Sequence, residues 1–297
     1  MIKYSREVLE AIKSDTPIVA LESTIISHGL PRPSNLETAL AVEAIVRSNA
    51  ATPATIAVIQ GEVHIGLEGD ELEMVADSDS FTKASIRDLP VLAAKNSSAA
   101  TTVAATAHIA AIAGIEFFAT GGLGGVHRGA RDTWDESADL IALANSPVLV
   151  VCAGAKSILD VPATLERLET LSVPILGYRT NNFPGFYLSD SGYPLEHRVD
   201  NPDVAAQVWR ARSELSLGQR GMIVANPVIN QISPELHNRL LQEGLAAAER
   251  AAVRGKAVTP FLLEFFHANS GGESLRVNIE IIKSNAALAA QIAVAAR

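Results

Sequence analysis

The chain has 297 residues, 48% of them hydrophobic, and its 33 Asp and Glu outnumber its 24 Lys and Arg to give a net charge of −9. This length suffices for a large buried core, in one big α/β domain or in two smaller ones. The acidic balance argues against sequence-independent nucleic-acid binding, which depends on a basic surface. We therefore expect a soluble enzyme with no nucleic-acid partner.

The sequence shows no feature of an exported or membrane-spanning protein. Its single cysteine, Cys152, lies inside an apolar run, so a disulfide framework is excluded and a reducing compartment is expected. Residues 1–15 are charged and amphipathic and lack the apolar core of a signal peptide. The alanine-rich residues 99–113 are interrupted by Thr and His and fall short of a membrane span. We expect a cytoplasmic protein with no membrane partner.

Short apolar runs alternate with helix-like patterns along most of the chain. This alternation predicts a mostly parallel sheet covered by helices on both faces, a three-layer α/β/α fold. The expected strands are residues 18–21, 55–59, 117–120, 148–152, 173–176 and 222–225, and the expected helices are residues 36–47, 101–113, 157–171, 234–253, 259–267 and 274–296. Gln60-Gly61-Glu62, between two β-rich runs, predicts a hairpin that would make the sheet mixed. Without a repeat, a linker or a break in composition, we expect one domain over residues 1–297.

A lysine stands at the end of one of the expected strands. Lys156 follows the apolar residues 148–152 after a turn at Ala153-Gly154-Ala155, and a helix-like pattern starts at Ser157. An uninterrupted apolar run indicates a strand buried on both faces, and ligands of open α/β sheets bind beyond the carboxyl ends of the strands. Desolvation near a helix N-terminus disfavours a charged amine, so Lys156 is a candidate nucleophile. A phosphate-binding or surface lysine explains the motif equally well.

Other expected strands also end in residues that can carry chemistry. Partial burial of Glu22, after residues 18–21, would raise its pKa and suit a general acid or base. A carboxylate that caps the following turn or pairs with a lysine is the alternative. Residues 121–129 (GGLGGVHRG) allow backbone amides to approach an anion, but lack dinucleotide and P-loop spacing. His127 and Arg128 beside them favour an anionic ligand, although a structural role for His127 is equally open. A tight turn with positive φ is the alternative. Because parallel strands end at one edge of a sheet, we expect these groups to converge.

An acidic cluster follows the glycine-rich segment. It comprises Asp132, Asp135, Glu136 and Asp139, and a helix would place Asp135 and Asp139 on one face. Carboxylate oxygens suit Mg²⁺ or Mn²⁺, whereas the preference of acidic residues for helix N-termini explains the cluster as simply. The histidines show no zinc-hydrolase spacing. Further upstream, Lys83 could bind phosphate or merely decorate a loop.

Seven segments, spread over nearly the whole chain, match one known family in sequence and in order. They are ALESTIISHGLPRP (residues 20–33), RDLP (87–90), ATTVA (100–104), FATGGLGGVHRGA (118–130), SADL (137–140), VCAGAKSILD (151–160) and VANP (224–227). In these segments the chain closely resembles the pseudouridine-5′-phosphate glycosidases. The His-Arg-Gly and Ala-Gly-Ala-Lys-Ser blocks are specific, which makes this assignment strong.

The resemblance implies reversible cleavage of pseudouridine 5′-phosphate to uracil and ribose 5-phosphate, a step of pseudouridine catabolism. It implies a homotrimeric α/β/α enzyme that uses one Mn²⁺ per subunit. Lys156 matches the nucleophile of the family, Glu22 its proton donor and Asp135 its metal ligand. Substrate contacts are implied for Lys83, Val103, Ser137, Ala138 and Asp139, and are expected for His127 and Asn278.

The implied chemistry explains why a lysine is needed. Pseudouridine joins ribose to uracil through carbon, so no leaving nitrogen can be protonated. The resemblance implies that the sugar ring opens and that Lys156 attacks C1′ to form an imine, an electron sink, while Glu22 carries protons for C5 of uracil. The paired carboxylates of ordinary glycosidases are not required. Lys83 would hold the phosphate or lower the pKa of Lys156, and the sequence does not separate these roles.

Two other functions fit parts of the sequence. A class I aldolase also uses a Schiff-base lysine, but its (β/α)₈ barrel needs eight strand–helix units and about six strands are convincing here. A catalytically inactive sugar-phosphate or nucleotide sensor on the same fold has no need of Glu22, Asp135 and Lys156 together. We therefore expect an enzyme.

Overall fold

The computed structural model describes residues 2–254 and 257–297, and within these residues eleven strands form one sheet. The order along the main path is β1-β4-β3-β2-β7-β8-β11-β9-β10, and β6 pairs with β3 and β5 beside this path. The strands are β1 (Ile2–Tyr4), β2 (Ile18–Glu22), β3 (Thr52–Ile59), β4 (Glu62–Ile65), β5 (Thr82–Ala84), β6 (Ala99–Thr101), β7 (Phe117–Ala119), β8 (Leu149–Cys152), β9 (Ile175–Tyr178), β10 (His197–Val199) and β11 (Met222–Ala225).

The sheet is mostly parallel, as predicted, with antiparallel pairing of β3 to β4 and to β6. The predicted hairpin is confirmed, because Ile59 pairs with Glu62 across Gln60 and Gly61. Both turn residues have positive φ, 50° and 81°, which is the conformation of a type I′ turn. The sheet runs openly from β1 to β10 and so does not close into an aldolase-type barrel.

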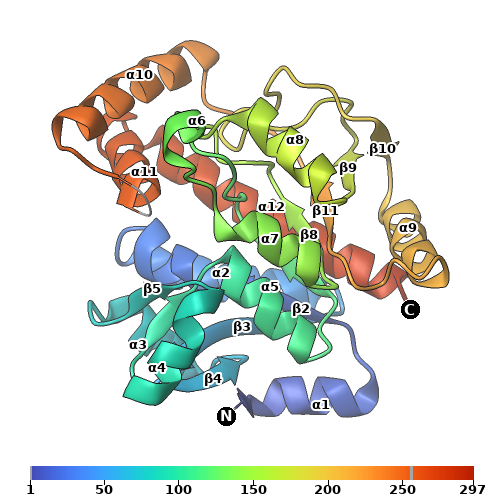
Figure 1. The fold of residues 1–297 in the computed structure, drawn as a ribbon. Coiled ribbons are helices and arrows are strands. Elements are labelled where there is room, and N and C mark those ends of the chain that lie inside the picture. The colour runs from blue at the N-terminus through green and yellow to red at the C-terminus, as the bar shows by residue number, and fades with distance from the viewer. Residues whose placement is uncertain (1, 255–256) are drawn as a thin grey trace.

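Helices cover both faces of the sheet and complete three layers (Figure 1). Successive residues of a strand point to opposite faces of the sheet. Val151 packs in the core on one face with α2, α9 and α12, and Val150 packs in the core on the other face with α1, α5, α7 and α8. The helices are α1 (Arg6–Ser14), α2 (Ser34–Ser48), α3 (Gly69–Asp77), α4 (Leu89–Lys95), α5 (Val103–Ile112), α6 (Ala130–Thr133), α7 (Ala138–Asn145), α8 (Val161–Thr170), α9 (Pro202–Glu214), α10 (Pro234–Arg250), α11 (Val258–Asn269) and α12 (Glu273–Ala295), with the short turns η1 (Ile25–Gly29) and η2 (Ile86–Asp88).

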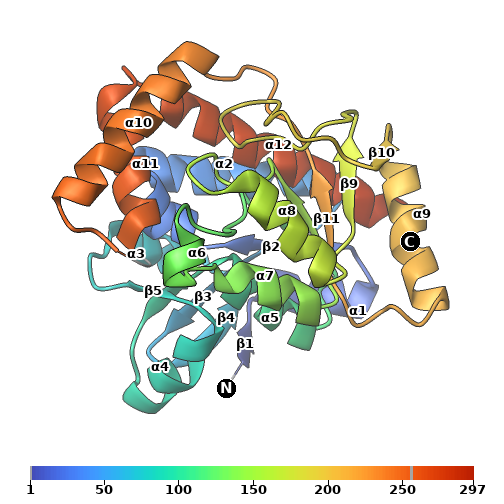
Figure 2. The same ribbon diagram turned by 45° about the horizontal axis from the view of Figure 1, so that its top comes forward.

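Helices α10 and α11 lie together at the end of the molecule away from the C-terminus, as both ribbon views show (Figures 1 and 2). Leu240 of α10 and Phe266 of α11 are fully buried in a third apolar cluster. This cluster also contains Ile158 and Leu159, which follow β8, and Phe186. The helix pair is therefore packed against the segment that carries Lys156.

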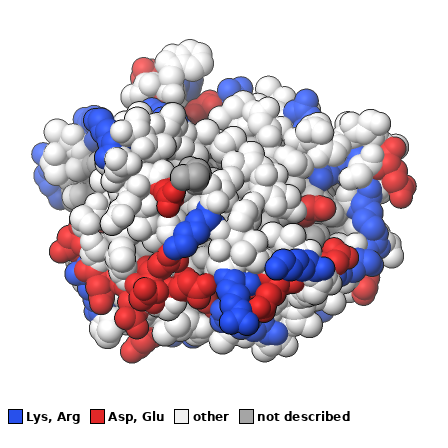
Figure 3. Space-filling model, turned by 90° about the horizontal axis from the view of Figure 1, so that it is seen from below, with Lys and Arg blue, Asp and Glu red and all other residues white. Residues whose placement is uncertain are grey.

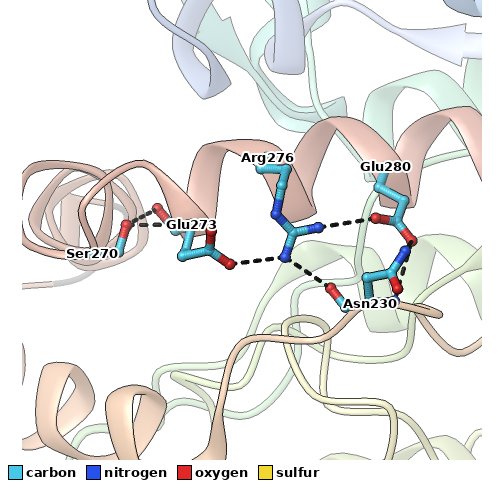
Figure 4. Close-up of polar contacts among 6 residues, drawn as sticks. Asn230, Ser270, Glu273, Arg276 and Glu280 are labelled. Atoms are coloured by element: carbon cyan, nitrogen blue, oxygen red, sulfur yellow. Dashed lines mark hydrogen bonds and ion pairs between the residues drawn. The ribbon is translucent and has the colours of Figure 1, made fainter.

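The loop after β11 is tied to α12 by polar contacts (Figure 4). Arg276 forms ion pairs with Glu273 (2.9 Å) and Glu280 (3.2 Å) and donates a hydrogen bond to the carbonyl of Asn230 (3.2 Å). The side-chain amide of Asn230 donates to Glu280 in turn (3.0 Å). These contacts hold α12, the helix that carries Asn278, against the carboxyl end of the sheet.

Charges of both signs mix on the face seen from below, where Lys and Arg stand beside Asp and Glu and an acidic band lies at one side (Figure 3). Two ion pairs of the N-terminal region, Lys3–Glu71 and Arg6–Glu10, each have an N–O distance of 2.9 Å and an exposed cation. Because water screens such cations, these pairs contribute little to stability. Among the helices described, none combines the length and apolar character needed to cross a membrane.

Two local predictions are wrong. Helix α8 begins at Val161 rather than at Ser157, because the carboxylate of Asp160 accepts a hydrogen bond from the amide of Ala163 (3.1 Å) and Pro162 follows. Lys156 therefore lies in a turn and not at a helix N-terminus. Asp135 and Asp139 also do not share a helix face, because α7 begins at Ala138. The other predicted elements are present, with ends shifted by no more than three residues.

Shortening a buried side chain of β8 tests whether the apolar cores on the two faces of the sheet stabilise the fold. Leu149 of β8 is 0% exposed, so Leu149→Ala is expected to lower the free energy of unfolding by about 2–5 kcal/mol through lost burial and a residual cavity. Urea denaturation measures this change. Leu215→Ala is the control, because Leu215 is 70% exposed and its truncation should cost less than about 0.5 kcal/mol. Equal effects of the two substitutions would contradict this description of the core.

Candidate active site

The carboxyl ends of β2, β7, β8 and β11 meet at one edge of the sheet, because these strands are parallel neighbours. Backbone hydrogen bonds continue beyond the strands: the amide of Ala153 donates to Gly121 (2.9 Å) and that of Asn226 donates to Cys152 (2.8 Å). The segments that follow the strands are therefore fixed side by side. The predicted convergence of strand ends is confirmed.

A cavity of about 500 Å³, counted with the solvent at its mouth, opens at this edge. Four of the predicted site residues line it, namely Glu22, Lys83, Lys156 and Asn278. Its remaining wall is largely apolar and comes from η1, from the loop after β9 and from α11, with Ile25, Phe186, Pro260 and Leu263 among the lining residues. The cavity thus joins a charged end to an apolar side, an arrangement that suits a small polar molecule with a flat or apolar part.

Glu22 is the last residue of β2 and is only 9% exposed. Its Oε1 atom accepts a hydrogen bond from the hydroxyl of Thr120, the residue that follows β7. Burial raises the pKa of this carboxyl above its ordinary value, while the positive charge of Lys156 and the hydrogen bond from Thr120 lower it in part. A carboxyl in this position holds its proton longer than an exposed one, which suits a general acid. This hydrogen bond of Glu22 comes from the side chain of Thr120 and not from an amide of the following turn, so it does not support a turn-capping role.

Buried amides fix the strand end that carries Thr120. The side chain of Asn285, on α12, is 0% exposed and donates to the carbonyls of Thr120 (2.7 Å) and Gly121 (3.3 Å). Asn226, after β11, donates to the Oδ1 atom of Asn285 (2.9 Å). Sequence reasoning missed Asn285, although a polar residue in the alanine-rich core face of a long helix is a usable signal.

The turn that carries Lys156 is docked on the glycine-rich segment. The amide of Lys156 donates to the carbonyl of Leu123 (3.1 Å). Gly154 has a φ of +79°, and a Cβ atom there would lie 1.8 Å from the carbonyl oxygen of Pro184, so no other residue fits. The loop after β9 and the Lys156 turn therefore approach each other as closely as their backbones allow.

Glycines within residues 121–125 leave space that neighbouring side chains fill. A Cβ atom on Gly122 would lie 2.6 Å from the ring of Phe186, and one on Gly124 would lie 2.3 Å from the hydroxyl of Ser137. The expected turn with positive φ is found within residues 121–129 only at Gly129. The sequence pattern therefore reflects close packing at Gly122 and Gly124.

The remaining predicted substrate-contacting residues form a second group that does not line this cavity. Asp139 is buried and accepts hydrogen bonds from the amides of Ala104 (2.9 Å) and Gly124 (2.8 Å), so its two oxygens join α5 to the glycine-rich segment. Val103 is the first residue of α5, Ala138 is the first residue of α7, and Ser137 is the N-cap of α7. The charge of Asp139 raises the pKa of Glu22, so the two groups are close enough to interact.

His127 and Asp135 lie beside each other, with 3.8 Å between Nδ1 and Oδ2. Burial lowers the pKa of His127, Asp135 raises it, and the charges of Lys156 and Lys83 lower it further. Glu136 forms an ion pair with Arg167 (2.9 Å). Within residues 2–254 and 257–297, no three His, Cys, Asp or Glu side chains come together as a metal site would require. A Mn²⁺ ion fits Asp135 only if water and substrate oxygens supply the other ligands.

Two further residues lie near the site. His28 was not predicted from the sequence, and Cys152 has no catalytic role. His28 lies in the π-helical turn η1, lines the cavity, and has its pKa lowered by burial and by the charge of Lys83. Turns of this kind are rare in proteins, and those that occur are often found at functional sites. No simple sequence pattern predicts them. Burial raises the pKa of Cys152 to about 12, so its thiol is not a nucleophile at neutral pH.

Comparison with known proteins gives a consistent relationship over almost the whole chain. The family model described as indigoidine synthase A like protein matches residues 7–295. A protein of Salinispora tropica named pseudouridine-5′-phosphate glycosidase is 54% identical over 99% of this chain and 91% of its own length. One of the same name from Caldanaerobacter subterraneus subsp. tengcongensis is 51% identical over 99% of this chain and 96% of its own.

Two solved structures share the fold. The prealnumycin C-glycosynthase AlnA, solved in complex with ribulose 5-phosphate, is 34% identical, with a TM-score of 0.91 over 100% of this chain and 97% of its own. An indigoidine synthase A-like protein from Thermotoga maritima is 35% identical, with a TM-score of 0.88 over 99% of this chain and 96% of its own. The family resemblance seen in the motifs and the predicted α/β fold are both confirmed.

The pH dependence of stability tests the burial of Glu22. Because folding raises the pKa of Glu22, the free energy of unfolding should fall as the pH rises from the ordinary carboxyl pKa to the raised one, and should stay reduced above it. Glu22→Gln cannot ionise and should therefore melt at a higher temperature than the wild type at pH 8. The difference should vanish near pH 4, below the ordinary carboxyl value. Thermal melts across this range measure it, and a destabilised variant at pH 8 would contradict the sign.

Proposed function

Because this chain belongs to the indigoidine synthase A like family and is about half identical to relatives named pseudouridine-5′-phosphate glycosidase, we propose that it cleaves pseudouridine 5′-phosphate reversibly to uracil and ribose 5-phosphate. The observation that carries this proposal is the shared cavity of Lys156 and Glu22. An amine and a buried, proton-retaining carboxyl at one cavity are the two groups that cleavage of a carbon–carbon glycosidic bond needs.

Lys156 is the proposed nucleophile. The bond between C1′ and O4′ of ribose breaks as the uracil ring supplies electrons, and the bonding pair leaves with O4′. The unprotonated Nζ atom of Lys156 adds to C1′, and the proton that Nζ then loses passes to O4′, which becomes a hydroxyl group. The product is an open-chain sugar that carries both uracil and a secondary amine on C1′. Docking of the Lys156 amide on Leu123 fixes the backbone from which the amine reaches into the cavity, and such positioning supplies much of the rate.

Glu22 is the proposed proton donor to the base. Its proton passes to C5 of uracil, the C1′–C5 bond breaks, and the nitrogen lone pair forms an iminium between Lys156 and C1′. Uracil is thereby released, and water hydrolyses the iminium to ribose 5-phosphate and Lys156. The amine leaves with one extra proton, which returns to the carboxylate of Glu22 and restores the starting state. The raised pKa of Glu22 keeps the carboxyl protonated to higher pH than usual, and Thr120 holds its Oε1 atom.

The two ends of the site suit the two parts of the substrate. Lys83 at the cavity brings positive charge for a phosphate. The amide of Ala104 in α5 is already bound by Asp139 and that of Ala105 by Thr102, so Val103 would contact the substrate only through its own groups. Ser137, Ala138, Asp139 and His127 would complete this end of the site. Asn278 lines the cavity with both donor and acceptor groups and suits the edge of uracil.

The proposal extends to a metal, an assembly and a compartment. One Mn²⁺ per subunit would bind at Asp135, with water and substrate oxygens as further ligands, and would supply positive charge that organises the phosphate. We propose further that the whole chain acts as one domain and assembles as a homotrimer, which light scattering in solution would test. Because the single cysteine excludes an intrachain disulfide, we propose a cytoplasmic location.

Replacement of the nucleophile gives the most direct test. Purified wild-type protein should release uracil from pseudouridine 5′-phosphate, and Lys156→Ala should reduce this release at least about 10⁴-fold because no imine can form. Borohydride with ribose 5-phosphate should label the peptide that contains Lys156 in the wild type only.

Thermal melting of Lys156→Ala is the control and should match that of the wild type. An aldolase would leave pseudouridine 5′-phosphate intact, and a sensor would bind it without turnover. Near-normal uracil release by Lys156→Ala would remove the imine mechanism.

Removal of the predicted metal ligand tests the role of Asp135. After treatment with a chelator, wild-type activity should rise when Mn²⁺ is added back, and Asp135→Ala should lose this response. Asp132→Ala, a nearby exposed carboxylate, is the matched control and should keep it. The same Mn²⁺ response in Asp135→Ala and wild type would show that the metal binds elsewhere.

A further inference from the structure

A serine and a histidine form a buried pair directly behind the Lys156 turn. Ser157 and His237 are 6% and 3% exposed, and the Oγ atom of Ser157 lies 2.7 Å from the Nε2 atom of His237. The two residues are 80 positions apart in sequence, and His237 belongs to α10. A short buried hydrogen bond over this distance along the chain constrains the relative position of the two segments.

The direction of this hydrogen bond follows from its surroundings. We assign the ring proton of His237 to Nδ1, because this atom lies 3.4 Å from the Oδ1 atom of Asn238, an acceptor. The Nε2 atom then accepts the hydrogen bond from the hydroxyl of Ser157. Burial and the charge of Arg128 both lower the pKa of His237, which keeps the ring neutral. Neither Ser157 nor His237 lines the cavity, so the pair does not act as a nucleophile and base.

Arg128 holds the same turn through backbone carbonyls. Its Nε atom donates to the carbonyl of Ile158 (3.1 Å), and its Nη2 atom contacts the carbonyl of Ser157 (3.4 Å). Arg128 belongs to the glycine-rich segment, whereas His237 belongs to the α10–α11 pair. The residues directly after Lys156 are therefore held by two side chains from two separate parts of the fold.

The histidine also connects the turn to the wall of the cavity. The rings of His237 and Phe266 lie 5.6 Å apart, and Phe266 stacks on Tyr187 at 5.4 Å. Phe266 belongs to α11, one turn beyond Leu263, which lines the cavity. The position of α11 at the cavity and the position of the Lys156 turn are thus joined through one packed aromatic group.

We propose that His237 is a positioning residue for Lys156: by accepting the hydrogen bond of Ser157, and together with Arg128, it holds the turn in the geometry from which the amine attacks. The expected effect of His237 on reaction rate rests on the proposed function of Lys156. The expected effect of His237 on the conformation of the turn does not. Substrate binding, which depends on other residues, should change little.

Variants of both partners test this proposal. In borohydride trapping with ribose 5-phosphate, His237→Leu and Ser157→Ala should lower the maximal labelling rate about 10–100-fold, because small displacements of a reacting group cost this much, and should leave the half-saturating concentration unchanged. His237→Gln, which keeps an acceptor near the Nε2 position, should restore most of the rate. The double variant should be no slower than the worse single variant.

Amide hydrogen exchange supplies a readout that does not depend on activity. Peptides that cover residues 153–160 should exchange faster in His237→Leu and Ser157→Ala, with the rest of the sheet edge unchanged. His64→Gln, at a buried histidine on β4, is the matched control and should alter neither readout.

The two readouts separate failure of this proposal from failure of the proposed function. If the wild type is not labelled, the proposed function fails, and the exchange result alone decides the positioning role. Unchanged exchange in both variants would overturn the proposal. Normal trapping rates in both variants, when the wild type is labelled, would overturn it as well.

Discussion

The parallel pairing of β2, β7, β8 and β11 is the constraint on which the rest of the structure depends. It brings residues that are 134 positions apart, Glu22 and Lys156, to the same edge of the sheet and to the same cavity. Backbone hydrogen bonds also join the segments that follow these strands, so the spacing of the segments does not depend on side-chain contacts alone. Catalytic geometry of this kind rests on the rigid sheet, whereas the walls of the cavity come from loops and from α11.

The charges of the site balance one another in a buried setting. Burial favours the protonated form of Glu22, and the lysines at the cavity oppose that preference. The proposed reaction needs both a proton on this carboxyl and a free amine on Lys156, so the electrostatic balance is part of the chemistry. Asp139 accepts hydrogen bonds from backbone amides with both oxygens, and its negative charge raises the pKa of Glu22.

A shell of polar residues that do not line the cavity supports those that do. Asn285 and Asn226 hold the strand end that carries Thr120, and Arg128 and His237 hold the turn that carries Lys156. Asn285 and Arg128 donate to backbone carbonyls, whereas Asn226 binds the side chain of Asn285 and His237 binds the hydroxyl of Ser157. The same fold occurs in a C-glycosynthase solved with ribulose 5-phosphate.

The sequence by itself determined the layered α/β fold, the hairpin at Gln60-Gly61 and the strand ends at which Glu22 and Lys156 stand, because hydrophobic periodicity and turn chemistry are local properties. Only the tertiary structure decided that Lys156 lies in a turn, that Asp135 and Asp139 belong to different elements, and that Asp139 binds amides. Asn285, His28 and His237 acquire their surroundings from segments far away along the chain. No local pattern records such contacts, because they exist only once the helices have packed on the sheet.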